Sequence, residues 1–284
     1  LTDPESFGGD PKDSFDVIVP SLPGYGFSSP LQSSGINFWE TADIWVYLMR
    51  NVLGYDRFAA GGGDWGALVT SQLGHKHAKY IIGTYIHLMA PLDLFNGPLP
   101  DKMDHTEEEQ KYFDRNEAFF TNESGYSAIQ TTKPQTVAYG LNDSPIGLCS
   151  WILEKRRTWS DSEGDVESRF TKDDLLTTVC IYWFTQTYGT SARYYYECVH
   201  NPWTPSHRTM PIVEAPTGIG VFPNEVIMMP RSWAEKYYNL FHWTEMPSGG
   251  HFAPMEEPEA LVEDIRTFFR QLAHSTKFTD TYGG

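Results

Sequence analysis

The stretch Phe58-Ala59-Ala60-Gly61-Gly62-Gly63-Asp64-Trp65-Gly66 decides the fold of this 284-residue chain. A short apolar run ends in an aspartate flanked by glycines, and residues 67–73 can form a helix after it. A strand, a tight turn and a helix in this order are the context of a nucleophile on a G-x-nucleophile-x-G turn. Glycines matter there because the turn is strained and side chains beside it would clash with neighbouring elements. An ordinary glycine and aspartate turn is the alternative, and the stretch alone leaves the two interpretations even.

An aspartate at the centre of this turn narrows the chemistry. Hydrolases of esters carry serine at the corresponding place. A carboxylate that attacks a carbon atom forms an ester intermediate, and water must then cleave that ester. If Asp64 is a nucleophile, the substrate must therefore offer an electrophilic sp³ carbon, as epoxides and alkyl halides do.

The composition is that of a globular protein with many aromatic residues and a formal net charge of −16. This acidity argues against nucleic acids as partners, because no basic stripe is present to neutralise phosphates. It also disfavours anionic lipid surfaces and anionic substrates. The longest apolar stretches have the length of strands, so no membrane-spanning helix is expected. The cysteines Cys149, Cys180 and Cys198 form neither a disulfide framework nor a zinc pattern.

Strands alternate with helices near both ends of the chain. The patterns predict strands at 15–20, 58–60, 81–89, 211–216, 219–222 and 241–246, and helices at 38–53, 67–73, 232–239 and 256–273. The run from Phe15 to Pro20 is apolar and rich in β-branched residues, which predicts a buried strand. Strands that alternate with helices indicate an α/β fold with a mostly parallel sheet.

The alternation stops at Pro91. From there to about His207 no further strand is convincing, and helices are predicted at 106–120, 145–159 and 173–197. The first of these opens with Thr106-Glu107-Glu108-Glu109, which is typical of a capping box. We therefore expect an inserted helical cap at 91–207, between a first part of the core at 1–90 and a second part at 208–284.

An aspartate nucleophile needs a base that activates water and an acid that orients the base. In hydrolases with this turn the chain order is nucleophile, acid, histidine. His251 lies on a glycine turn after the last predicted strand, although a lone loop histidine is more often a surface residue. Glu225 follows the preceding strand and is the candidate acid, with a solvated loop charge as the alternative. Glu214 lies before that loop and Glu245 within the last strand, so both fit less well.

Longer motifs surround these residues. In the predicted core they are Ser21-Leu22-Pro23-Gly24-Tyr25-Gly26-Phe27-Ser28, Gly62 to Gly66, Phe222-Pro223-Asn224-Glu225 and Gly249-Gly250-His251-Phe252-Ala253; in the predicted cap they are 123–126, 132–136, 141–148 and 191–197. Together they resemble the α/β-hydrolase epoxide hydrolases, and the microsomal-type branch matches best. The resemblance spans nearly the whole chain. It implies an α/β-hydrolase fold and an enzyme that converts an apolar epoxide and water to a vicinal diol, with no metal or organic cofactor.

The resemblance also implies a role for five side chains. Asp64 corresponds to the nucleophile, Glu225 to the charge-relay partner and His251 to the base. Tyr126 and Tyr195, in two of the cap motifs, correspond to acids that hydrogen-bond the epoxide oxygen. A phenol suits this task, because ring opening leaves an alkoxide that must be stabilised and protonated.

Neighbouring residues bear on the assignment of Tyr195 and on the oxyanion hole beside Asp64. Tyr194 and Tyr196 could be confused with Tyr195 by a one-residue slip, and without the resemblance a tyrosine-rich helix indicates aromatic packing. The backbone N–H of Trp65 is expected to be one donor of the oxyanion hole. In the family the second donor comes from a His-Gly-x-Pro motif upstream of the position of Leu1, and that motif is absent from this sequence.

The same comparison of motifs bears on where the chain starts. The family has its first strands upstream of Leu1 and places another strand between the run 15–20 and the run 58–60. A sheet without an interior strand would expose unpaired backbone groups on both sides of the gap. We therefore expect the sequence to be the larger, C-terminal part of a longer enzyme. The cytoplasm fits these residues, and the endoplasmic reticulum would fit if an N-terminal anchor, which some relatives carry, preceded them.

Two other functions fit part of the sequence. A haloalkane dehalogenase shares the aspartate nucleophile, and Trp151, Trp159 or Trp183 could bind the halide; tyrosines in the cap argue instead for an epoxide. A catalytically inactive ligand-binding protein of the same fold would fit a natural truncation, whereas the intact set of Asp64, Glu225 and His251 argues against decay. A homodimer is compatible with each of these functions.

Overall fold

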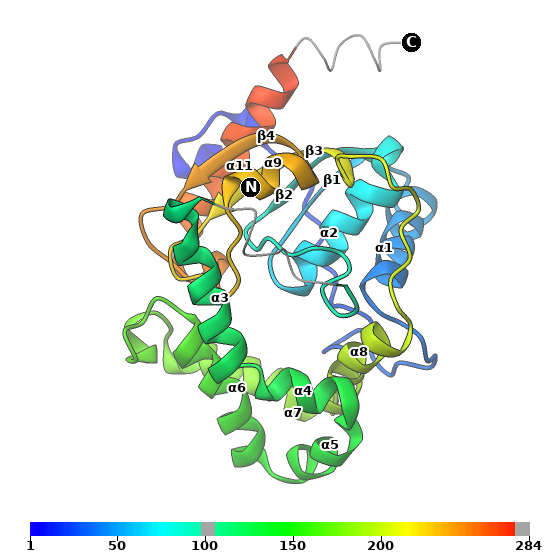
Figure 1. The fold of residues 1–284 in the computed structure, drawn as a ribbon, viewed down its shortest axis with the longest axis vertical. Helices are drawn as coiled ribbons and strands as arrows, with labels where there is room; N and C mark the ends of the chain where they lie inside the picture. Colours follow the sequence, from blue (N-terminus) through cyan, green and yellow to red (C-terminus); the bar gives the residue numbers. More distant parts are fainter. Residues whose placement is uncertain (98–105, 276–284) are drawn as a thin grey trace.

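The computed structural model describes residues 1–97 and 106–275, and one parallel sheet lies at its centre (Figure 1). The strands are β1 (Phe58–Gly62), β2 (Ile81–Ile86), β3 (Val213–Val221) and β4 (Tyr238–Glu245), side by side in this order. All three neighbouring pairs are parallel. The predicted α/β fold with a parallel sheet is confirmed, although β2 ends at Ile86 and not at Met89.

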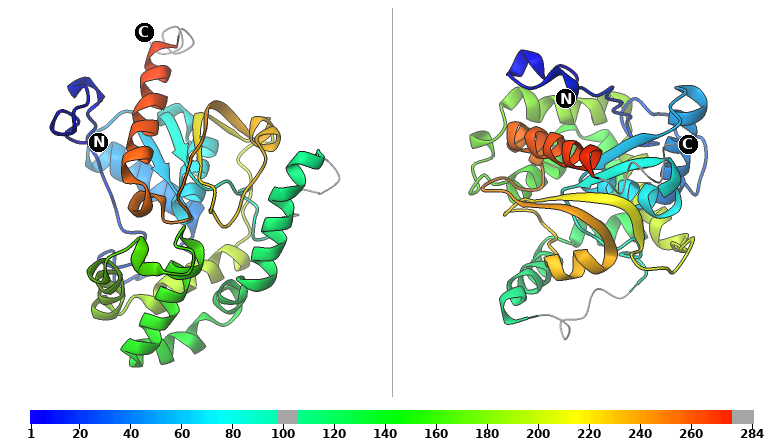
Figure 2. Two further views of the ribbon diagram at one scale, coloured as in Figure 1. Left: turned by 90° about the vertical axis from the view of Figure 1, so that its left-hand side faces the viewer. Right: turned by 90° about the horizontal axis from the view of Figure 1, so that it is seen from above.

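Helices cover both faces of the sheet, as a parallel sheet requires. α2 (Trp65–Lys76) packs on β1, β2 and β3 with α1 (Phe38–Tyr47) beside it, and α11 (Pro258–His274) packs on β2, β3 and β4 (Figure 2). Consecutive strand side chains point to opposite faces. Accordingly, Ile86 belongs to the apolar cluster on the α2 side, and Tyr85 belongs to the cluster on the α11 side.

The predicted connection from strand to turn to helix is present. β1 leads through Gly63 and Asp64 directly into α2. The helix predicted at 38–53 is also present, as α1 followed by the π-helical turn η3 (Leu48–Val52). It ends where Gly54 adopts a φ of 81°, a conformation that glycine reaches without steric cost. Short 3₁₀ turns also occur in the first part of the chain: η1 (Glu5–Phe7), η2 (Pro11–Asp13) and η4 (Ala78–Tyr80).

The strand predicted from Phe15 to Pro20 is wrong. These residues belong to no strand, and Val19 is 86% exposed. β-branched residues form a strand only where a neighbouring strand supplies backbone partners. Within the described residues the sheet begins at β1, so this run has no such neighbour. Only Phe15 packs, with its ring edge-on to Phe269 of α11.

Among the described residues, six helices lie between β2 and β3 in the chain, and they gather mainly below the sheet in Figure 1. They are α3 (Gln110–Asn122), α4 (Gly125–Thr132), α5 (Pro134–Asp143), α6 (Pro145–Trp159), α7 (Lys172–Thr185) and α8 (Tyr188–His200), with the short turns η6 (Glu107–Glu109) and η7 (Val166–Ser168). A capping box at Thr106 and Glu109 precedes α3, as predicted. The helical stretch predicted at 173–197 is divided, because Gln186 adopts a left-handed φ of 55° that ends α7.

The last part of the sheet differs from the prediction in two respects. The helix predicted at 232–239 ends at Tyr237, and β4 begins at Tyr238 rather than at Phe241. The two runs at 211–216 and 219–222 form a single strand, β3, with an irregular register before Pro216. Proline within a strand calls for such an irregularity, because it has no N–H to donate. Gly218 in the middle of β3 has no side chain, and a methyl group there would lie 2.8 Å from the ring of Phe268 in α11. The helices α9 (Arg231–Tyr237) and α10 (Ala253–Glu256) complete this part.

A buried polar network joins α11 to the sheet away from the elbow, the turn at residues 62–66. The Asp264 carboxylate accepts hydrogen bonds from the Tyr85 hydroxyl at 2.5 Å and the Thr244 hydroxyl at 2.7 Å, and His242 Nε2 lies 2.9 Å from it. The carboxylate raises the pKa of His242. Burial alone would raise the pKa of Asp264, but hydrogen bonds from His242, Tyr85 and Thr244 outweigh it and lower that pKa.

We expect Asp264→Asn to destabilise the fold by about 2–3 kcal/mol near pH 5, because it breaks a buried pair and its hydrogen bonds. The lowered pKa of Asp264 contributes stability to the fold that is present above its ordinary pKa of 3.8. The raised pKa of His242 contributes stability that is present below its ordinary pKa of 6.5 and is lost as pH rises through the raised value. Urea unfolding at pH 5 and pH 9 measures the difference between variant and parent. Glu263→Gln, at an exposed neighbouring residue, is the control, and an equal loss in both variants would contradict the prediction.

Candidate functional site

Asp64 occupies a strained turn at the amino end of α2. Its backbone has a φ of 48° and a ψ of −129°, and its Oδ1 accepts the N–H of Trp65 at 2.5 Å. A methyl group on Gly62 would lie 2.6 Å from the backbone of Gly66, so glycine is required at 62. The space around Gly66 itself is open, which differs from the expectation that side chains would clash on both sides. Strain of this kind is characteristic of functional turns.

The structure brings Asp64, Glu225 and His251 together. His251 Nδ1 lies 2.6 Å from Glu225 Oε1, and His251 Nε2 lies 3.0 Å from Asp64 Oδ2. Glu225 follows β3 and His251 follows β4, so all three side chains come from the carboxyl ends of parallel strands, where α/β folds place their sites. Glu225 is 2% exposed and His251 is 6% exposed.

Burial and charge act in opposite directions on the imidazole. Burial alone would lower the pKa of His251, but the carboxylates of Glu225 and Asp64 outweigh it and raise the pKa to about 10. Burial alone would likewise raise the pKa of Asp64, but its hydrogen bond to His251 and the N–H of Trp65 keep it below its ordinary value. His251 is therefore an imidazolium and Asp64 a carboxylate at neutral pH, and the ring donates its Nδ1–H to Glu225 and its Nε2–H to Asp64.

Tyr126 and Tyr195 lie opposite this group, on α4 and α8. Their rings pack edge to face with centroids 5.8 Å apart, and Tyr195 also packs against Trp65 at 4.6 Å. Burial raises the pKa of each phenol, so both side chains stay protonated and able to donate. Both line the same cavity as Asp64 and His251.

The three consecutive tyrosines of α8 point in different directions. Tyr195 lines the cavity. Tyr194 is turned into the core, where its hydroxyl lies 2.7 Å from that of Thr41. Tyr196 stacks on His200 with ring centroids 3.7 Å apart. Of the three, Tyr195 alone lines the cavity that contains Asp64, and its role as an acid stays a prediction.

The cavity has a volume of about 540 Å³ and lies between the sheet and the helices that follow β2. Its floor is formed by the elbow and His251, and its walls are mainly aromatic: Tyr25, Tyr126, Trp151, Trp159, Tyr182 and Tyr195. Trp183, a candidate halide-binding residue, is not among the lining residues and packs in a cluster of α5 to α8 instead. A cavity of this size and apolarity suits a small hydrophobic ligand.

His87, which none of the motifs indicated, lies behind Asp64. A methyl group on Gly63 would lie 1.9 Å from His87 Nε2, so the ring is pressed against the elbow backbone. Burial lowers the pKa of His87 to about 4, and its imidazole is therefore neutral. One signal could have found it: His87 follows the apolar run of β2 directly, at the same carboxyl edge as Glu225 and His251.

Glu214 and Glu245, the less suitable candidates for the acid, lie away from His251. Glu214 is exposed at the start of β3 and lies 3.8 Å from His207, and Glu245 is exposed at the end of β4. Neither lines the cavity. In residues 1–97 and 106–275, no group of three or more His, Cys, Asp or Glu side chains is arranged to hold a metal ion. Within the same ranges, every helix is too short or too polar to cross a membrane.

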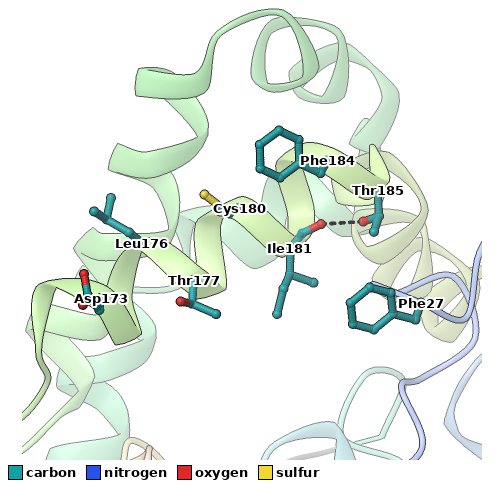
Figure 3. A pocket seen from close by; sticks show the side chains of 8 residues that line it. All are labelled: Phe27, Asp173, Leu176, Thr177, Cys180, Ile181, Phe184 and Thr185. Atoms are coloured by element: carbon teal, nitrogen blue, oxygen red, sulfur yellow. Dashed lines mark hydrogen bonds between the residues drawn. The ribbon is translucent and has the colours of Figure 1, made fainter.

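A second hollow, of about 500 Å³, lies on the outer side of α7 (Figure 3). Apolar side chains of α7, among them Leu176, Ile181 and Phe184, line it together with Phe27, and Thr185 donates a hydrogen bond to the Ile181 carbonyl. It contains none of the groups placed around Asp64. We assign no catalytic role to this outer groove.

Comparisons with known proteins bear on the fold and the family. Residues 8–133 match the family described as alpha/beta hydrolase fold. A protein of Stigmatella aurantiaca is 43% identical over 273 residues, which are 96% of this chain and 60% of that protein. Epoxide hydrolase 1 of Oryctolagus cuniculus is 38% identical over 94% of this chain and 63% of its own length. The crystal structure of juvenile hormone epoxide hydrolase from the silkworm Bombyx mori has a TM-score of 0.76 at 31% identity, over 89% of this chain and 63% of that one.

A parallel sheet with a nucleophile elbow, and an acid and a histidine at its carboxyl edge, define an α/β-hydrolase. Within that class the chain belongs to the epoxide hydrolase family, and it is of the microsomal type that the motifs resembled. It spans 60 to 63% of the length of three curated relatives that it matches.

Proposed function

We propose that the protein is an epoxide hydrolase, which converts an apolar epoxide and water to a vicinal diol through an ester on Asp64. One observation carries the proposal: Asp64 Oδ2 lies 3.0 Å from His251 Nε2 on the floor of a cavity whose opposite wall holds two protonated phenols. We further propose residues 91–207 as the cap, of which 98–105 lie outside the described residues, and 1–90 and 208–284 as the core.

The first step opens the ring. An Asp64 carboxylate oxygen attacks an epoxide carbon, the bond from that carbon to the ring oxygen breaks, and Tyr126 or Tyr195 gives the oxygen a proton. The product is a hydroxyalkyl ester of Asp64. Oriented donors of this kind stabilise charge only where it develops, which lowers the barrier of the step.

The second step hydrolyses the ester. His251 takes a proton from water, the hydroxide adds to the ester carbonyl carbon, and the Trp65 N–H donates to the oxyanion. The alkoxide then leaves with the proton from His251. The regenerated carboxyl ionises, and its proton restores the phenol, so each cycle consumes one water. General-base help of this type contributes about 10²–10⁴-fold.

Esterification itself prepares His251 for the second step. In the free protein, each of the two imidazolium N–H groups faces one carboxylate, and these carboxylates raise the pKa of His251 to about 10. The ester on Asp64 is neutral and removes one of these charges. The pKa of His251 therefore falls once the ester has formed, and the ring can lose its proton and act as a base.

The lining of the cavity supports an apolar epoxide as the substrate class. Its aromatic walls offer apolar contact area, and the net charge of −16 disfavours polyanionic ligands such as nucleic acids. A homodimer stays an expectation, which sedimentation of the whole protein would test.

A single turnover in ¹⁸O-water tests the proposal in the whole protein, with a small panel of apolar epoxides. We expect the first diol to carry an unlabelled oxygen from Asp64 and the label to enter the Asp64 peptide, as mass spectrometry would show. Label in the diol alone, with none in that peptide after repeated turnovers, would overturn the covalent mechanism. Retained activity in Asp64→Ala would do the same.

A haloalkane dehalogenase is the second candidate, and Trp151 and Trp159 in the lining favour it. It would release halide from an alkyl halide through the same ester. The phenols of Tyr126 and Tyr195 favour the epoxide, because halide needs no proton to leave. Halide release from chloro- or bromoalkanes at a rate above that of diol formation would reverse this order.

A further inference from the structure

The end of α6 packs against the base loop, residues 249–252, which carries the proposed base His251. The backbone N–H of His251 donates to the carbonyl oxygen of Trp159 at 2.9 Å. A methyl group on Gly250 would lie 2.8 Å from that carbonyl oxygen and 3.0 Å from the backbone nitrogen of Asp161. Because the two backbones touch with no room for a side chain, any shift of the α6 end displaces the imidazole.

The carboxylate of Glu256 joins the same two segments. It accepts the N–H groups of Gly250 at 3.1 Å and Phe252 at 2.9 Å, which flank His251, and the N–H of Asp161 at 2.7 Å. Glu256 is 8% exposed. Hydrogen bonds to an ionised acceptor are roughly twice as strong as neutral ones, so these three bonds hold the base loop firmly.

The carboxylate of Asp161 joins the base loop to the acid loop, residues 222–225, which carries Glu225. It accepts the N–H of Gly249 at 2.9 Å and the side-chain amide of Asn224 at 2.5 Å. Asn224 precedes Glu225, and its own N–H donates to the carbonyl oxygen of Gly249 at 3.0 Å. A single side chain from the segment after α6 therefore spans both loops, and Arg169 holds it in place at 2.9 Å.

The nucleophile is positioned separately. Asp64 lies on the turn between β1 and α2, and it receives hydrogen bonds from Trp65 and His251. No hydrogen bond of the described residues joins Asp161 or Glu256 to this turn. The two carboxylates thus bear on the base and its acid, and not on the group that attacks first.

We propose that Asp161 and Glu256 are positioning residues that hold the pair Glu225 and His251 against the end of α6, and that they act on ester hydrolysis. The inference rests on the proposed function, since it assigns them to its second step. Loosening either carboxylate lets the imidazole move away from the ester while Asp64 keeps its place. A displacement of 1 Å can cost about 10²-fold in rate.

Rapid-quench single turnovers of the whole protein test this with Asp161→Asn and Glu256→Gln. We expect ester hydrolysis to slow about 10- to 100-fold while ester formation stays near the parental rate. The ester then accumulates as a mass gain on the Asp64 peptide, and KM falls together with kcat. A general loss of structure would lower both rates equally, so the accumulation separates the two explanations.

Glu259→Gln is the matched control, because Glu259 is exposed in the first turn of α11 and no hydrogen bond of the described residues joins it to the loop of His251, to Asp161 or to Arg169. It should leave both rates unchanged. Asp161→Glu keeps the charge and should recover part of the lost rate; if Glu256→Gln does not fold, the two variants at Asp161 still decide. Parental ester hydrolysis in Asp161→Asn would overturn the inference. Absence of any ester in the parent protein would instead overturn the proposed function.

Discussion

Replacing His251 with glutamine should stop the protein after one ring opening. Glutamine can hydrogen-bond Glu225 and Asp64 but cannot take a proton from water. Turnover should fall by about 10²–10⁴-fold, the usual contribution of a general base. One equivalent of epoxide should remain attached, and mass spectrometry of the intact protein should find the added mass on the peptide that contains Asp64.

The same measurement separates the role of a base from that of a structural residue. His242→Gln is the control, because His242 is also a part-buried histidine held by a carboxylate, but it lies in the network of Asp264 and away from the cavity. It should lower stability and leave no ester attached. Diol formation at the parental rate in His251→Gln would contradict the assignment of the base.

Replacing both Tyr126 and Tyr195 with phenylalanine should suppress ring opening itself. Both phenols line the cavity opposite Asp64, and each of the two substitutions removes only one hydroxyl group. Loss of one such donor costs about 10²–10³-fold, so the double variant should lose at least about 10³-fold. Pre-steady-state formation of the ester measures the step directly, and no ester should accumulate.

Each single variant should retain part of the activity, since the second phenol can still donate. Tyr194→Phe is the control, because its hydroxyl lies 2.7 Å from that of Thr41 in the core and not in the cavity. It should reduce stability by about 1 kcal/mol, as for one buried hydrogen bond, and leave the rate of ring opening intact. Unchanged ester formation in the double variant would exclude the phenols as acids.

Local patterns in the sequence predicted the elements that depend on neighbours in the chain. The turn at Asp64 and the helix that begins at Phe38 follow from glycine placement and apolar spacing, and both are present. The run from Phe15 to Pro20 has the composition of a strand but no partner strand in the described residues, and composition alone carries no information about partners. The break of the helix at Gln186 was missed because glutamine is not a residue that usually ends helices.

The site could be predicted to the extent that its residues stand on recognisable motifs. Asp64, Glu225 and His251 lie far apart in the chain, and the order of nucleophile, acid and base supplied what spacing could not. His87, Asp161 and Glu256 stand on no such motif. Their positions depend on contacts between segments distant in sequence, which only the folded chain brings together.

Asp64 lies on the turn after β1, whereas the two phenols that face it lie on α4 and α8, in another part of the chain. In the proposed mechanism, the distance between these parts limits how an epoxide can bind, because its ring must reach Asp64 and a phenol at once. A substitution that moves α4 or α8 would change which of the two ring carbons is presented to Asp64, and so which stereoisomer of the diol is formed. Under the proposed mechanism, selectivity would therefore depend on how the helices pack, while Asp64 keeps its place.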